Sequence, residues 1–133
     1  MNAVRIKRLA KKYFEINKYS NYIEEALLGK SYYLDILKSK GIDTSKRNLT
    51  KLKKYISIYK AVFIKTCQRL DSFDSYIAKE VYMKGKKVCR VSMDNYLSEA
   101  GVYRILKKFD LYFYYDLLKC ARIINPLMCL LNC

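Results

Sequence analysis

The chain contains few residues that turn or break a polypeptide, with one proline and four glycines among 133 residues. Folds made of many strands need frequent tight turns, which glycine and proline usually supply. Long stretches are instead dominated by Leu, Lys, Ile, Glu and Ala, as is typical of helical proteins. Because 52% of the residues are apolar, the chain can bury a core, and we expect an all-α fold, a small helical bundle.

Apolar residues at helical spacing predict where the helices lie. The clearest case is about 49–70, where apolar residues from Leu49 to Leu70 recur three and four positions apart. Gly41 and Gly85 are the expected ends of two other helices. Two further predicted helices cover 3–18 and about 74–84. Another begins at a cap on Ser20 or Asn21 and runs to about Lys40, with Gly29 weakening its middle.

Three segments are expected in this chain. A basic helical arm (1–44) precedes a helical module (45–118), and an apolar tail (119–133) follows it. The boundary after the arm lies in a stretch rich in turn-forming residues, including Asp43, Thr44 and Ser45.

The net charge is +15, from 27 basic and 12 acidic residues. Such an excess favours a polyanionic partner, either nucleic acid or an anionic membrane. The alternative is that an AT-rich genome simply encodes many Lys, Tyr, Ile and Asn residues. Most of the excess lies in 1–20 and 41–70, whereas 91–110 is balanced, so these basic segments are suited to phosphates or to a partner.

Several functional classes are disfavoured by what the sequence lacks. It has no histidine, no pair of cysteines separated by two residues, and no pattern typical of a catalytic or phosphate-binding site, so we expect no metal, no cofactor and no enzyme. Five cysteines without a secretion signal favour a reducing cytoplasm. No apolar run reaches the eighteen residues typical of a membrane span.

Residues 86–109 predict a helix-turn-helix near the C-terminal end of the chain. Val88 and Val91 supply the apolar face of a first helix, with Ser92 as its small inward residue. Leu97 fills the turn, and Ser98 caps a second helix. Within that second helix, core positions at helical spacing are Val102, Ile105, Leu106 and Phe109.

The outer face of the second helix, 98–109, is the predicted DNA-reading surface. Arg104 is suited to guanine or phosphate, and Tyr103 to phosphate or a thymine methyl group. Gly101 allows a close approach of the backbone. The full set of predicted DNA contacts is Lys86, Lys87, Arg90, Ser98, Glu99, Ala100, Tyr103, Arg104, Lys107 and Lys108.

The order of these segments resembles the RinA/ArpU-type phage late-transcription regulators, whose C-terminal part is similar to the fourth conserved region of sigma-70 factors. The resemblance covers about 49–118 and is carried by the long helix 49–70, the helix from Tyr76 to Gly85 and the string Ser-x-x-x-Val-Tyr-Arg from Ser98 to Arg104. It implies a transcription regulator of a phage or mobile element in a bacterial cytoplasm, with double-stranded DNA and RNA polymerase as partners. Tyr96 stands where such turns usually have glycine, and a turn shifted onto Asn95 is the alternative.

Other roles are also compatible with the sequence. A small helical module that binds an acidic host or phage protein is the main alternative, and binding of the arm 3–18 to anionic lipid is the third. We expect a homodimer, because one recognition helix covers only a few base pairs. Its interface would use helix 49–70 or the aromatic stretch 111–118, unless the arm folds back over those aromatic residues.

Overall fold

The computed structural model describes residues 3–131, and every regular element in that range is helical, with no strand. The all-α prediction is therefore confirmed. The elements are α1 (Ala3–Arg8), the 3-10 turn η1 (Leu9–Lys12), α2 (Tyr13–Leu27), α3 (Ser31–Ser39), α4 (Lys46–Gln68), α5 (Ser72–Ala78), the π-helical turn η2 (Lys79–Met83), α6 (Val88–Asp94), α7 (Glu99–Leu118), the 3-10 turn η3 (Ala121–Ile123) and α8 (Ile124–Leu130).

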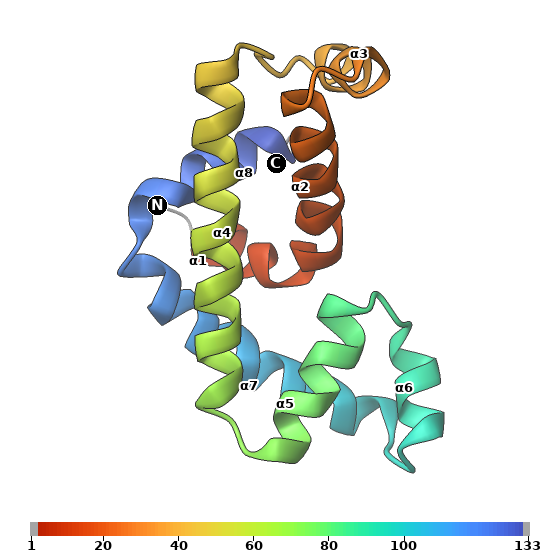
Figure 1. Ribbon diagram of the computed structural model, residues 1–133. Coiled ribbons are helices and arrows are strands. Elements are labelled where there is room, and N and C mark those ends of the chain that lie inside the picture. The colour runs from red at the N-terminus through yellow and green to blue at the C-terminus, as the bar shows by residue number, and fades with distance from the viewer. Residues whose placement is uncertain (1–2, 132–133) are drawn as a thin grey trace.

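Helix α4 is the central element, and α2, α7 and α8 all pack against it (Figure 1). Its apolar stripe is buried as predicted, with Ile56, Tyr59 and Phe63 at most 1% exposed. The helix begins at Lys46 because the Ser45 side chain caps it, accepting a hydrogen bond from the Asn48 amide at 3.3 Å.

The N-terminal helices differ from the prediction at more than one place. The predicted helix 3–18 is interrupted by η1 and continues as α2. The expected caps Ser20 and Asn21 lie inside α2, where Ser20 is buried, so that prediction is wrong. The break falls instead at Gly29, whose φ of +87° lets the chain turn between α2 and α3. Gly41 and Gly85 also have positive φ and follow helical segments, which confirms the predicted stops.

Helix α5 begins two residues before the predicted start at 74. Asp71 caps it, because its side chain accepts a hydrogen bond from the Asp74 amide at 2.8 Å. The last turn then widens into η2, from Lys79 to Met83, before the chain turns at Gly85. Figure 1 shows this segment, α6 and the start of α7 together, at the end of the molecule furthest from α3.

Segments from both ends of the chain contribute to one core. Ile6 and Leu9 of the expected arm are buried, and so are Ile124 and Leu127 of the expected tail. Rings from α2, α4 and α7 meet in the centre, where the Phe63 ring lies 4.6 Å from Tyr13 and 4.8 Å from Phe109. Residues 1–2 and 132–133 of the arm and tail lie outside the described range.

The arm covers part of the aromatic stretch 111–118 by packing α1 against α7. Phe113 is fully buried, and the Lys7 ammonium lies over the Tyr114 ring, 5.5 Å from its centre. The Tyr59 hydroxyl donates a hydrogen bond to the Leu9 carbonyl, which ties η1 to α4. The folded-back arm expected as an alternative is therefore what the structure shows for this side of α7.

Candidate nucleic-acid interface

The connection between α6 and α7 is held by three side-chain hydrogen bonds. Ser98 caps α7 as predicted, since its hydroxyl oxygen accepts from the Gly101 amide at 3.0 Å. The Ser92 hydroxyl donates to the Leu97 carbonyl at 2.8 Å, and the Asn95 amide group donates to the Val91 carbonyl at 2.9 Å. These bonds fix the position of the first turn of α7 relative to α6.

The left-handed residue of this turn is Tyr96, with a φ of +55°. The alternative register, with the left-handed backbone at Asn95, is wrong, because Asn95 is the residue that follows α6 and has a negative φ of −115°. A tyrosine takes the position that glycine usually holds, and its side chain is 98% exposed.

Burial shows which residues of the two helices face the core. Val91 and Ser92 of α6 face the core, and so do Val102, Leu106 and Phe109 of α7. Ile105 and Leu97 are partly buried against it. The residues predicted to point outward do so, and the rotation of α7 about its axis is the one that the sequence pattern requires.

All ten predicted DNA contacts are exposed. They do not form one uniform surface. A shallow basic hollow lies beside the start of α6 and is lined by Lys86, Lys87 and Arg90. The others lie on α7 or at its cap, where Tyr103 and Lys107 border a cavity on the side facing the N-terminal segment.

Some of these charged side chains already form ion pairs within the chain. The Lys86 ammonium lies 2.5 Å from a carboxylate oxygen of Glu80, and Lys108 lies 3.6 Å from Asp74. Arg90 is 3.6 Å from Asp94, one turn away on the same helix. By contrast, Lys87, Arg104 and Lys107 have no acidic partner among residues 3–131, so their charges are available to a polyanion.

Glu80 is the residue of this region that the sequence interpretation missed. Glu80 is 3% exposed, and besides its ion pair with Lys86 its carboxylate accepts a hydrogen bond from the Lys84 ammonium at 2.9 Å. The hydrogen bond from Lys86, then that from Lys84, lowers the pKa of Glu80 below its ordinary value. The four-residue spacing of Glu80 and Lys84 was a visible signal, but Lys86 reaches the same carboxylate only because the chain turns at Gly85.

A second buried carboxylate joins α7 to α4. Asp116 accepts a hydrogen bond from the Thr66 hydroxyl at 2.6 Å and another from Arg69. The Arg69 guanidinium also lies over the Tyr112 ring, 4.7 Å from its centre. This cluster fixes the C-terminal half of α7 and leaves the N-terminal half to project beyond α4 (Figure 1).

Among residues 3–131 no three Cys, Asp or Glu side chains lie close enough together to hold a metal ion. Cys67, Cys89, Cys120 and Cys129 are free thiols, and Cys133 lies outside the described range. None of the helices in the described part of the chain is long and apolar enough to cross a membrane.

Comparison with family models, with curated proteins and with solved structures finds no match to this chain. Its function is therefore inferred from its own residues.

Proposed function

We propose that this chain binds double-stranded DNA, with the N-terminal half of α7 in the major groove and α6 beside the backbone. The observation that carries the proposal is the outer face of α7. Arg104 and Tyr103 are exposed there, and neither side chain makes a hydrogen bond or an ion pair with any residue in the described range. Bidentate arginine and aromatic side chains on an exposed helix are suited to base edges and thymine methyl groups.

Phosphate binding has separate support from the charge of the chain. The net charge of +15 favours a polyanion, and the hollow lined by Lys86, Lys87 and Arg90 lies just ahead of α7 in the chain. Lys107 adds an unpaired positive charge one turn beyond Arg104. The pairing of Lys86 with buried Glu80 and of Lys108 with Asp74 makes these two lysines the weaker candidates for a direct phosphate contact.

A regulatory role follows from the same proposal. With its resemblance to the RinA/ArpU-type regulators, the chain is proposed to control transcription of phage or mobile-element genes inside a bacterial cell, in contact with RNA polymerase. No catalytic step is part of this role.

Binding to an acidic protein is the second candidate, and the turn between α6 and α7 favours it. Met93 and Tyr96 are 76% and 98% exposed, which makes an apolar tip beside basic residues. A DNA-binding surface needs no apolar tip at this point, whereas a protein partner would bury it.

The deciding experiment is selection of bound duplexes from a random DNA pool, followed by affinity measurements on the enriched sequence at several salt concentrations. We expect one enriched motif and an affinity that falls steeply with salt, because bound phosphates release counterions. Absence of enrichment would exclude sequence-specific regulation. Salt-dependent retention on random DNA without enrichment would leave only non-specific phosphate binding.

A further inference from the structure

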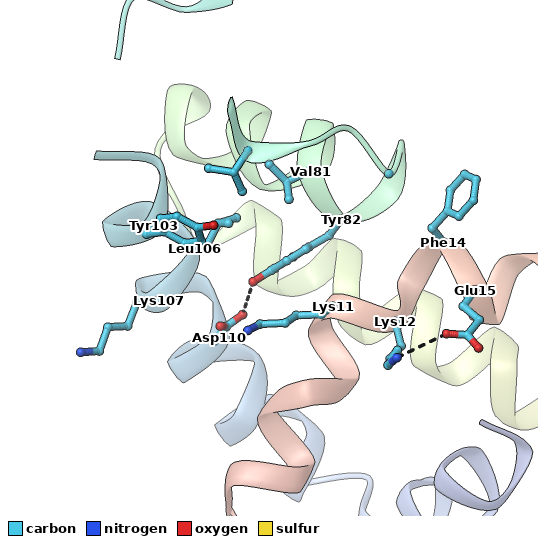
Figure 2. A pocket seen from close by; sticks show the side chains of 12 residues that line it. Lys11, Lys12, Phe14, Glu15, Val81, Tyr82, Tyr103, Leu106, Lys107 and Asp110 are labelled. Atoms are coloured by element: carbon cyan, nitrogen blue, oxygen red, sulfur yellow. Dashed lines mark hydrogen bonds and ion pairs between the residues drawn. The ribbon is translucent and has the colours of Figure 1, made fainter. Parts of the chain in front are cut away.

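A cavity of about 650 Å³ lies between the N-terminal segment and the α6–α7 pair. Figure 2 shows its lining side chains, which come from η1 and α2 on one side and from η2, α6 and α7 on the other. Phe14, Val81, Val88 and Leu106 give it apolar walls. Its volume falls in the range of roughly 300–1,000 Å³ that is typical of small-molecule sites.

The polar groups at its floor already have partners. The Tyr82 hydroxyl donates a hydrogen bond to Asp110 at 2.8 Å, drawn as a dashed line in Figure 2. Burial raises the pKa of Asp110, an effect that this hydrogen bond and the charges of Lys11 and Lys7 oppose. Lys11 points toward Asp110 (Figure 2) and supplies a positive charge beside its carboxylate, so this carboxylate does not need a bound cation.

The rim is positively charged. Lys12 and Lys107 border the opening from opposite walls, together with Glu15. Lys12 pairs with Glu15 at 3.5 Å, but both side chains are more than a third exposed, so this pair is weak and can exchange for another anion. Lys107 has no acidic partner within residues 3–131 and carries its charge on a flexible stem.

We propose that this cavity binds a small amphipathic carboxylate with a flat aromatic body. The apolar walls and the half-exposed rings of Phe14 and Tyr103 would cover the body. Figure 2 shows the ammonium groups of Lys12 and Lys107 on opposite sides of the cavity, so their charges would attract the carboxylate to the rim without both contacting it. A bare inorganic anion would leave the apolar walls in contact with water. A cationic ligand would be repelled by the net charge of +15 on the chain. The proposal does not rest on DNA binding, although Tyr103 and Lys107 also belong to the proposed DNA surface.

The test is a titration of the full-length chain, labelled at its methyl groups, with 2-naphthoate and with its neutral isostere 2-naphthamide. We expect saturable binding of 2-naphthoate, with nuclear magnetic resonance shifts confined to methyl groups around the cavity, including Val81, Val88 and Leu106. Two exposed lysines give roughly a five-fold preference for the carboxylate over the amide. The double variant Lys12→Gln with Lys107→Gln should reduce that preference to within about two-fold.

The matched control is the double variant Lys54→Gln with Lys65→Gln, which removes two exposed charges from α4, away from the cavity lining. It should keep the full preference. Val88→Trp should fill the cavity and abolish binding in a chain whose helix content is unchanged. The proposal is overturned if 2-naphthoate shows no saturable binding, if the shifts map to another surface, if the amide binds equally well, or if Val88→Trp binds as the parent does.

Discussion

Glu80 illustrates how a single buried carboxylate decides which lysines are free to meet a partner. The carboxylate is 3% exposed and lies within reach of both Lys84 and Lys86. Moving Lys86 to a phosphate would leave this buried charge with one partner, which is costly. Lys86 therefore holds the segment before α6 in place, a role that its position among basic residues in the sequence did not show.

The first prediction concerns acid stability. The pKa of Glu80 is lower in the folded chain than in the unfolded chain, so folding is stabilised by Glu80 at neutral pH. That stability is lost as the pH falls below the ordinary glutamate pKa, about 4.3, and through the lower folded value. Urea unfolding midpoints measured from pH 7 to pH 3 should therefore fall less in Glu80→Gln than in the parent chain.

The control for this measurement is Glu24→Gln. The Glu24 carboxylate is about half exposed and lies 3.9 Å from Lys53, so its loss should barely change the pH profile. Equal profiles for the two variants would contradict the role given to Glu80.

The second prediction tests the proposed base contact. Arg104→Ala should weaken binding to the selected duplex by about 1–3 kcal/mol and relax the preference at one base position. Lys54→Ala, on the exposed side of α4, should lower affinity little and leave the sequence preference intact. A folded Arg104→Ala chain with unchanged affinity and preference would rule out base reading by Arg104.

The third prediction tests the rotation of α7 about its axis. Leu106 is 5% exposed, so Leu106→Ala should lower the free energy of unfolding by about 2–5 kcal/mol. Tyr103 is 58% exposed, and Tyr103→Ala should change it by no more than about 0.5 kcal/mol. Chemical denaturation measures both, and a larger effect of Tyr103→Ala would show that its ring packs into the fold.

At the scale of the elements, strong apolar periodicity was enough to predict α4, α6 and the first half of α7. Helix α7 continues to Leu118, nine residues beyond the predicted end at 109. The boundaries were less predictable, because they depend on single caps: Ser45 starts α4 and Asp71 starts α5. The break between α2 and α3 follows from the backbone at Gly29, whereas Ser20 was a plausible cap that tertiary packing buried inside α2. The widening of the helix at η2 was not predictable from the local sequence, because its inward-facing Glu80 pairs with Lys86, beyond Gly85, as well as with Lys84.

The fourth prediction concerns the turn between α6 and α7. A left-handed backbone costs a residue with a side chain roughly 1–2 kcal/mol, and the exposed Tyr96 ring offers no burial in return. Tyr96→Gly should therefore raise the free energy of unfolding by about 0.5–1 kcal/mol. Tyr32→Gly, which removes a tyrosine that is 68% exposed from the regular helix α3, should lower it by about 1 kcal/mol. A loss of stability in Tyr96→Gly would mean that the ring makes a stabilising contact.

For the whole molecule, the sequence indicated which residues are apolar but not which segments meet. The arm and the tail have weak or short patterns of their own, and their burial depends on α4, against which both α2 and α8 pack. The candidate site shows the same division. Exposure of the ten predicted contacts followed from helical periodicity, but the partners of Lys86 and Lys108 are carboxylates on η2 and α5, which only the tertiary fold brings near.

The packing within one chain limits how two copies could associate. The apolar stripe of α4, one surface expected for a dimer, is already buried within the chain. On α7, Leu111, Tyr115 and Leu118 remain 41%, 54% and 39% exposed. They follow Arg104 at steps of seven, four and three residues, so all four share one face of the helix.

The last prediction follows from that shared face, and it replaces the dimeric DNA complex expected from the sequence with a dimer that DNA separates. Two copies packed through Leu111 and Tyr115 would turn their Arg104 faces toward each other, with helix axes about 8–10 Å apart. A duplex does not fit between them, because its major groove alone is about 12 Å wide. Light scattering should therefore find a dimer at micromolar concentration, and an equimolar duplex of the selected sequence should convert it into complexes that hold one copy of the chain. The double variant Leu111→Glu with Tyr115→Glu should be monomeric and still bind DNA. A monomeric parent chain would contradict the dimer, and a dimer that binds one duplex without dissociating would show that its interface lies elsewhere.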